Sequence, residues 1–286
     1  MEALVSFLWA HGIGYKTISY AAVVIGFGFG SLLCLRLRIR RNWLALFLTA
    51  LPALLAGGAL MKLFGFASRA LYELSVGHQH SLREIWDAAG YVFYGGLLGY
   101  YGGIALYLPR MAPHRQRLGW DILATSFTLF HAVSRIGCYC AHRVVDGAWV
   151  WNPCCYGVKM NNAFCALFWE SRLPTQLIES AFEFLLFALM LTLLLRGGKK
   201  WRGKLPVLYL VAYPVFRYVI EFFRGDEVRG AVGPLSFSQL VSLLILLGVL
   251  IASVLRQKGV LKPLPEDAEE LDTASAGPES SPADER

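Results

Sequence analysis

Charged side chains are scarce in this sequence. Asp, Glu, Lys and Arg make up 16% of the 286 residues, whereas an average soluble domain carries about 25%. Hydrophobic residues reach 56%, and the mean hydropathy is +0.49. This composition excludes a soluble enzyme, a disordered chain, a collagen and a small disulfide-stapled scaffold as descriptions of the whole chain. It predicts an all-α polytopic membrane protein.

Two other features are missing. The N-terminus lacks the basic region of a cleavable signal peptide, because Glu2 is the only charged residue before His11. The cysteines form no CxxC pair, which favours disulfides in an oxidising compartment over a zinc site. Five of the six crowd together: Cys138, Cys140, Cys154, Cys155 and Cys165. We expect neither a metal nor a cofactor, and the disulfide connectivity stays open.

The formal net charge of +7 hides a division of the chain into two parts. Residues 263–286 contain eight acidic residues and one basic residue, and their Pro, Ser and Ala content predicts a disordered tail. Residues 1–262 are strongly basic and form the membrane domain. Such a charge suits the anionic surface of a lipid bilayer, and we expect no nucleic-acid partner.

Seven segments are apolar and long enough to cross the roughly 30 Å hydrocarbon layer as helices. They are residues 17–35, 43–64, 91–109, 118–141, 177–195, 205–223 and 235–255. The side that follows the first, third, fifth and seventh segments holds 15 Lys and Arg residues in short loops, against nine on the other side. By the positive-inside rule, the N-terminus lies outside and the acidic tail in the cytoplasm.

Two longer segments then fall on the outer face. Residues 65–90 have the mixed apolar and charged character of an interfacial helix. Residues 142–176 carry a cluster of cysteines and are too aromatic for a disordered loop. Long loops in compact proteins tend to be functional, so we expect the site on the outer face.

Ionisable side chains share one face of the sixth segment, because Tyr213, Arg217 and Glu221 are spaced four residues apart. Such groups are costly in hydrocarbon unless they pair or face a polar cavity. One interpretation is a structural ion pair between Arg217 and Glu221. The interpretation we favour is a site for an anionic ligand. Arg135, near the outer end of the fourth segment, favours a phosphate, because a guanidinium binds phosphate in bidentate fashion.

Four further residues carry weaker signals, each with an ordinary structural alternative. His131 lies one turn before Arg135 and is either a proton relay or a packing residue. Glu179 opens the fifth segment, where an acidic residue is common at a helix start. Gly95 and Gly96 allow either close helix packing or the approach of a lipid head group to the backbone.

Six stretches in this order resemble the prolipoprotein diacylglyceryl transferase family, of which the chain looks like a divergent member. They are YVFYGGLLGYYGG (91–103), HAVSRIGC (131–138), CCYG (154–157), LPTQLIES (173–180), YPVFRYVIEFFRGDE (213–227) and SFSQLVSL (236–243). The resemblance implies a seven-span protein of the bacterial inner (cytoplasmic) membrane with its site facing the periplasm. It also implies transfer of a diacylglyceryl group from phosphatidylglycerol to the lipobox cysteine of a prolipoprotein signal peptide, forming a thioether.

The resemblance carries roles over to single residues. It implies that Arg135 and Arg217 hold the phosphate and that Glu221 orients Arg217. The catalytic candidates are Tyr94, Arg135, Glu179, Arg217 and Glu221. The substrate-binding candidates are Tyr20, Gly95, Gly96, His131, Arg135, Gly157 and Tyr213.

The sequence also departs from the family. Tyr94 and Leu173 stand where the family has histidines, Cys138 stands where it has an asparagine, and residues 141–153 look inserted. The phosphate-binding residues are kept, but the group that takes the thiol proton is left open. The alternatives are a divergent homologue with another acceptor, or a non-catalytic lipid-binding membrane protein. A transporter is disfavoured, because the helix with Arg217 and Glu221 has no visible inverted repeat.

Overall fold

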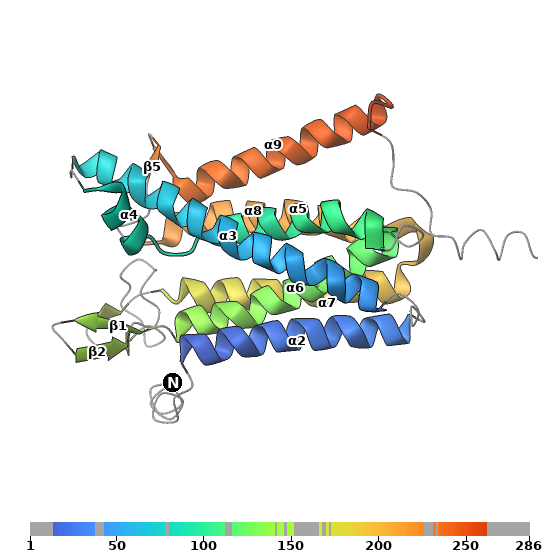
Figure 1. The fold of residues 1–286 in the computed structure, drawn as a ribbon, viewed down its shortest axis with the longest axis horizontal. Coiled ribbons are helices and arrows are strands. Elements are labelled where there is room, and N and C mark those ends of the chain that lie inside the picture. Colours follow the sequence, from blue (N-terminus) through green and yellow to red (C-terminus); the bar gives the residue numbers. More distant parts are fainter. Residues whose placement is uncertain are drawn as a thin grey trace, which may run out of the picture.

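Within the part of the chain that the structure describes, seven long helices run in alternating directions along the long axis of the molecule (Figure 1). The computed structural model describes residues 14–37, 43–77, 80–111, 116–140, 142–145, 148–151, 166–167, 170–171, 173–225, 231–232 and 234–261. The long helices are α2 (Tyr15–Arg36), α3 (Trp43–Val76), α5 (Phe93–Met111), α6 (Gln116–Tyr139), α7 (Thr175–Arg196), α8 (Leu205–Ile220) and α9 (Phe237–Gln257).

The remaining elements are short. They are α4 (Leu82–Ala88), two 3₁₀ turns, η2 (Gly198–Trp201) and η3 (Glu221–Phe223), and three antiparallel strand pairs. The pairs join β1 (His142–Val145) to β2 (Ala148–Trp151), β3 (Ala166–Leu167) to β4 (Glu170–Ser171), and β5 (Ala231–Val232) to β6 (Leu235–Ser236). The labelled β1, β2 and β5 and the helix α4 lie at one end of the bundle (Figure 1, left).

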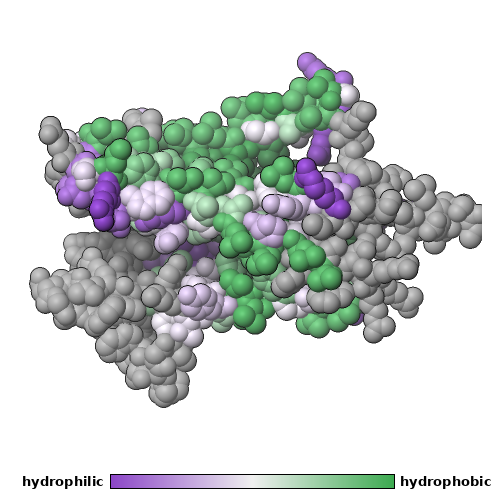
Figure 2. Space-filling view, in the orientation of Figure 1, coloured by the Kyte–Doolittle hydropathy of each residue, from purple (hydrophilic) through white to green (hydrophobic). Residues whose placement is uncertain are grey.

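The chain is a polytopic membrane protein. Within the described residues, five helices are long and apolar enough to cross a membrane: Thr17–Arg36, Leu48–Val76, Thr175–Arg196, Leu205–Phe223 and Phe237–Gln257. Hydrophobic residues cover α9 and the neighbouring helices, whereas hydrophilic residues gather toward the two ends of the long axis (Figure 2). This distribution is the one that a hydrocarbon layer with water on both sides selects.

All seven segments predicted as spans are helical, but α5 and α6 are not among the five that qualify by length and composition. The reason lies in their surroundings. Helix α6 packs against α2, α7 and α8, and it buries polar residues such as Asp121, Thr125 and Thr128. A helix that faces protein on most sides has no need of an apolar surface, because its polar groups find partners inside the bundle.

Helix α5 lies against α3 along a row of glycines spaced four residues apart. A Cβ at Gly99 would approach the Ala56 carbonyl oxygen to 2.6 Å, and a Cβ at Gly103 would approach the Ala53 Cα to 2.5 Å. Neither contact is sterically possible, so only glycine lets the two backbones come this close. The small face fixes α5, and with it the start of the helix where Tyr94 lies.

The structure corrects the expectation of a separate interfacial helix over residues 65–90. Helix α3 continues without a break to Val76 and ends at Gly77, whose φ is +72°. Arg69 forms an ion pair with Glu73 one turn later, and the Glu73 side chain is buried. The charged residues therefore extend α3 instead of ending it. Only Leu82–Ala88 forms a separate short helix, which Ser81 caps.

Candidate functional site

Nine polar side chains from α5, α6, α7, α8 and η3 meet inside the bundle, and we call them the polar cluster. They are Tyr94, His131, Arg135, Glu179, Glu183, Tyr209, Tyr213, Arg217 and Glu221. All are buried except Arg135, whose side chain is 13% exposed. Their hydrogen bonds and ion pairs form two layers, one turn apart along α6 and α7, with the outer layer nearer the end that carries β1 and α4.

The outer layer begins with a carboxylate held from two sides. The Arg135 guanidinium on α6 donates to Glu179 Oε2 on α7. The Tyr213 hydroxyl on α8 donates to the second oxygen, Glu179 Oε1, over 2.9 Å. Arg135 Nη1 also lies 3.8 Å from Cys138 Sγ. One carboxylate thus joins three helices, and its charge is balanced by the guanidinium.

The second arginine of the outer layer lies at the end of α8. Arg217 Nη2 is 2.8 Å from Glu221 Oε2 and donates to Ser238 Oγ of α9 over 3.3 Å. Arg224 Nε lies 3.8 Å from the same Glu221 oxygen. With Arg135 and Glu179, three arginines and two carboxylates meet among the described residues of this layer. The excess is positive, which favours an anion.

Both key guanidinium groups keep a buried nitrogen without a hydrogen-bond partner among the described residues. These atoms are Arg135 Nε and Arg217 Nη1. Buried donors are nearly always satisfied, so two of them in one layer indicate a place for a ligand or for water. Guanidinium donors match the oxygens of a phosphate in charge and geometry.

The inner layer centres on His131. Its Nδ1 lies 3.0 Å from Glu183 Oε1 and 2.9 Å from the Tyr209 hydroxyl. Tyr209 in turn donates to Glu183 Oε1 over 3.4 Å. The other ring nitrogen, Nε2, lies 3.8 Å from Glu179 Oε1. The inner layer therefore contacts the outer layer through Glu179.

Tyr94 is tied to α9. Its hydroxyl forms a hydrogen bond with Ser242 Oγ. Because Ser242 donates its own proton to the Ser238 carbonyl over 2.8 Å, Tyr94 is the donor in this pair. The first half of α9, with its capping box at Ser236, is therefore joined to the cluster through Ser238 and Ser242. The buried residues of α9 all lie in that half.

Three of the predicted site residues, Tyr20, Gly95 and Gly96, are described but are not part of these contacts. Tyr20 lies on α2 with 69% of its surface exposed. A Cβ at Gly95 would lie 2.1 Å from the Leu60 carbonyl oxygen, and one at Gly96 would lie 2.8 Å from Met61. This geometry corresponds to the helix-packing alternative, and a role in head-group binding stays a prediction for both. Gly157 lies outside the described residues.

The cysteines likewise form no site in the described part of the chain. Cys34, Cys138 and Cys140 are free thiols there. Cys154, Cys155 and Cys165 lie outside the described residues, so the predicted disulfides stay a prediction. Within the described residues no group of three or more His, Cys, Asp or Glu side chains could hold a metal ion.

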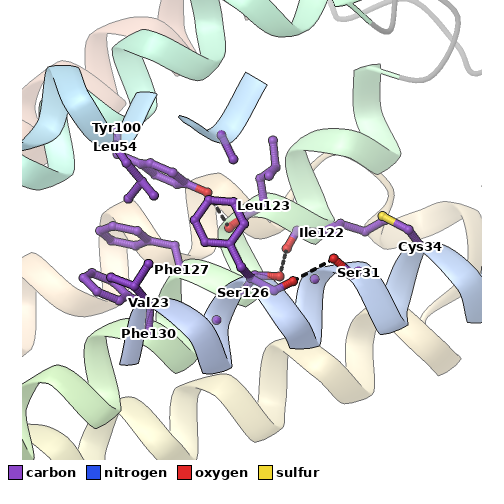
Figure 3. Close-up of a pocket in the computed structure, with 14 residues that line it drawn as sticks. Val23, Ser31, Cys34, Leu54, Tyr100, Ile122, Leu123, Ser126, Phe127 and Phe130 are labelled. Carbon is purple, nitrogen blue, oxygen red and sulfur yellow. Dashed lines mark hydrogen bonds between the residues drawn. The ribbon is translucent and has the colours of Figure 1, made fainter. Parts of the chain in front are cut away.

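An apolar pocket lies on the side of α6 that faces α2 (Figure 3). It encloses about 560 Å³, part of it open to the outside, between α2, α3, α5 and α6. Leu54, Phe127 and Phe130 point into it, with Cys34 at one end. No charged side chain is among its described lining residues, so it suits a hydrocarbon group and not a phosphate.

A family model for the prolipoprotein diacylglyceryl transferases matches residues 12–255. This chain belongs to that family. The match includes all seven long helices except the last two residues of α9, and it covers every residue of the polar cluster. The resemblance that the sequence motifs carried is thereby confirmed.

Named members of the family are similar to this chain at moderate identity. The phosphatidylglycerol–prolipoprotein diacylglyceryl transferase 2 of Clostridium perfringens is 34% identical over 180 residues, 59% of this chain and 64% of that protein. The phosphatidylglycerol–prolipoprotein diacylglyceryl transferases of Clostridium tetani and Clostridioides difficile are 32% and 30% identical over 180 and 172 residues. These cover 58% and 59% of this chain, and 64% and 62% of the relatives. The match thus spans less than two thirds of each relative's length.

Sequence reasoning missed part of this family member's polar cluster. Glu183 reads as an ordinary helix-start acid, and Tyr209 gives no signal of its own. Both nevertheless continue a visible pattern, since Glu183 follows Glu179 by four residues and Tyr209 precedes Tyr213 by four. Extending the four-residue spacing by one turn along each helix would have found the inner layer.

Proposed function

We propose that this protein transfers a diacylglyceryl group from phosphatidylglycerol to the thiol of a lipobox cysteine in a prolipoprotein signal peptide. Membership of the family and the names of its relatives support the reaction. The observation that carries the proposal is the pair of buried guanidinium nitrogens, on Arg135 and Arg217, that have no hydrogen-bond partner among the described residues of this membrane protein. An anion in hydrocarbon needs such donors, and a phospholipid brings its phosphate there.

The reaction places distinct demands on the cluster. The thiol sulfur attacks the lipid carbon that bears the phosphate ester, and the carbon–oxygen bond breaks so that glycerol phosphate leaves with the electron pair. Arg135 and Arg217 stabilise the negative charge that grows on the leaving phosphate. This electrostatic stabilisation is strongest in a site with little water. Glu221 and Ser238 orient Arg217, and Glu179 orients Arg135. No metal or cofactor takes part in this scheme.

The proposal includes the orientation in a bacterial cytoplasmic membrane. Seven helices cross the bilayer, with α5 and α6 shielded by the others. The helix ends that carry Arg36, Arg110, Arg196 and Arg256 lie at the end opposite α4 and β1. The positive-inside rule puts that end in the cytoplasm and the outer layer of the cluster toward the periplasm.

A direct assay tests the proposal. The purified chain is incubated with labelled phosphatidylglycerol and a synthetic lipobox peptide, and the peptide is examined by mass spectrometry for a thioether-linked diacylglyceryl group. Release of glycerol phosphate is measured in parallel and should match the product in amount. The same peptide with serine in place of its cysteine should give neither product, because the hydroxyl is a far weaker nucleophile.

The outcomes separate this function from its alternatives. A lipidated peptide and an equal amount of glycerol phosphate support the transferase. Binding of phosphatidylglycerol without product from any of several thiol peptides would instead indicate a lipid-binding protein. Product with a thiol peptide that lacks a lipobox, but none with the lipobox peptide, would indicate a divergent acceptor.

A further inference from the structure

The His131 ring is buried and packed between aromatic side chains. It stacks on Phe93 with a centroid distance of 3.6 Å and an interplanar angle of 8°. The Tyr213 ring meets it edge-on at 4.9 Å. Only 1% of the side chain is exposed. Packing of this kind holds the imidazole in one orientation, so its two nitrogens have separate roles.

The partners of Nδ1 decide which nitrogen carries the proton. Glu183 Oε1 at 3.0 Å is an acceptor, and the Tyr209 hydroxyl is already a donor to that same carboxylate. Nδ1 therefore donates its proton toward these oxygens in the neutral ring. Nε2 is left with its lone pair, and among the described residues it has no hydrogen-bond partner although it is buried. A carboxylate on Nδ1 with a free Nε2 is the arrangement of a histidine general base.

Other groups in the cluster are less able to accept a proton. Glu179 already accepts hydrogen bonds on both oxygens, from Arg135 and from Tyr213. The Tyr94 hydroxyl donates to Ser242. Of the histidines whose side chains are described, His131 alone lies in the cluster. His80 follows the end of α3 and contacts Glu73 instead.

We propose that His131 Nε2 takes the proton of the acceptor thiol, and that Glu183 and Tyr209 are the positioning residues that hold it for this step. This assignment rests on the proposed transferase function. The S–H proton passes to Nε2, and the sulfur electron pair forms the new bond to the lipid carbon. The carbon–oxygen bond breaks, and its electron pair leaves with glycerol phosphate. The imidazolium then returns its proton to the departing phosphate, which leaves the ring neutral for another cycle.

The groups around His131 suit an imidazolium that forms during the reaction and loses its proton again afterwards. Among the described residues, the titratable groups that face the ring are Glu179 and Glu183 from α7 and Tyr209 and Tyr213 from α8. Arg135, Arg217 and Tyr94 interact with Glu179 beside it. Glu183 at 3.0 Å and Glu179 at 3.8 Å flank the ring on its two nitrogen sides. Both carboxylates stabilise the imidazolium that forms during the step.

The test compares the wild-type chain with His131→Gln, as full-length purified protein with phosphatidylglycerol and a cysteine lipobox peptide. We expect kcat at neutral pH to fall by about 100-fold or more, as is typical when a general base is removed. KM for phosphatidylglycerol should change little, because Arg135 and Arg217 remain. The residual rate should rise about tenfold per pH unit up to the thiol's own pKa of about 8.5, since only thiolate then reacts.

A selenocysteine peptide separates loss of the base from damage to the site. A selenol is more acidic than a thiol and is largely ionised at neutral pH, so it needs no base. We expect His131→Gln to approach the wild-type rate with this peptide. Arg217→Lys should stay impaired with both peptides, because its defect concerns the phosphate. His80→Gln makes the same chemical change outside the cluster and should match wild type with both.

Two further variants decide the matter if His131→Gln does not fold. Glu183→Gln and Tyr209→Phe keep the imidazole but weaken the contacts that position it. Each variant should lower kcat with the cysteine peptide by about tenfold, and kcat should return toward the wild-type value with the selenocysteine peptide. The assignment is overturned if His131→Gln keeps full activity, or if the defects of the folded variants are equal with both peptides. A wild-type chain that lipidates neither peptide would overturn the transferase function itself.

Discussion

Arg135 on α6 binds the Glu179 carboxylate on α7, and this contact between residues 44 positions apart in the chain joins the two helices. The Glu179 side chain is 1% exposed. Its other oxygen holds the Tyr213 hydroxyl of α8. The contact therefore has two functions, since it fixes the arginine proposed to bind the phosphate and joins the helices around it.

Glu179→Gln should lower both stability and activity. The amide keeps the shape of the side chain but leaves the Arg135 charge unpaired inside the bundle, a loss of about 3 kcal/mol or more in buried pairs. We expect a lower thermal unfolding temperature in detergent and weaker phosphatidylglycerol binding. Asp87→Asn is the matched control, since it breaks an exposed ion pair with Arg83. An equal effect of the two variants would contradict the role given to Glu179.

Arg217→Lys tests the second proposed phosphate ligand. The lysine keeps the positive charge, but one ammonium cannot reach Glu221 and Ser238 while also offering two parallel donors to a phosphate. We expect kcat to fall by about 100-fold or more, as when a single charge-stabilising donor is lost. Arg110→Lys, at the exposed end of α5, should leave the rate unchanged. Full activity of Arg217→Lys would refute the assignment of the phosphate to this residue.

Tyr94→Phe distinguishes two candidate proton acceptors. The Tyr94 hydroxyl is a donor to Ser242, which stays satisfied through the Ser238 carbonyl when the tyrosine oxygen is removed. The lost hydrogen bond costs about 1 kcal/mol, so we expect activity within tenfold of wild type. A drop of 100-fold in a variant that still binds phosphatidylglycerol would instead give Tyr94 the catalytic role that the sequence suggested.

The sequence predicts the helices of this protein well because apolar length is a local property. The face that carries Tyr213, Arg217 and Glu221 also follows from spacing alone, and the structure places Arg217 and Glu221 in contact. The pairing of Arg135 with Glu179 does not follow from spacing, since it depends on how α6 and α7 pack. In the sequence alone, Arg135 and Glu179 each have an ordinary local explanation. Only the packing of α6 against α7 shows that they form a pair.

One error and one open question of the sequence analysis have the same origin. The charges at Arg69 and Glu73 looked like part of a separate interfacial helix, yet they pair along α3 and continue it. Gly95 and Gly96 were open to two interpretations, and only the position of α3 shows which atoms they face. A single sequence contains no information on which neighbour covers a helix face, so burial inside the bundle could not be assigned.

Gly99→Ala should destabilise the contact between α3 and α5. The added Cβ would lie 2.6 Å from the Ala56 carbonyl oxygen, and backbone cannot move aside as a flexible side chain can. Overpacking of this kind costs about 1–3 kcal/mol. Gly102→Ala is the matched control on the same helix, since its Cβ would meet nothing within 4 Å. Unfolding in detergent measures both, and equal stability of the two variants would contradict the close packing of α3 and α5.

The capping box of α4 predicts a pH dependence outside the membrane helices. The Ser81 hydroxyl and the Ser81 backbone N–H both donate to Glu84 Oε2, each over 2.7 Å. These two hydrogen bonds, the hydroxyl's first, hold the pKa of the Glu84 carboxyl below its ordinary value. A carboxyl whose pKa is lower in the folded state than in the unfolded state stabilises the folded helix at pH values above its unfolded-state pKa. This stabilisation is lost as the pH falls through its folded-state pKa.

We therefore expect the amides of α4 to be protected at neutral pH and to open more readily as the pH falls below about 4.3, the ordinary pKa of a glutamate in the unfolded chain. Hydrogen exchange followed by mass spectrometry, corrected for the intrinsic exchange rate at each pH, measures the opening. Ser81→Ala removes the hydroxyl that donates to Glu84 and accepts from its backbone N–H. That variant should show higher exchange at neutral pH and a smaller pH dependence. An unchanged profile in Ser81→Ala would mean that another contact holds the start of α4.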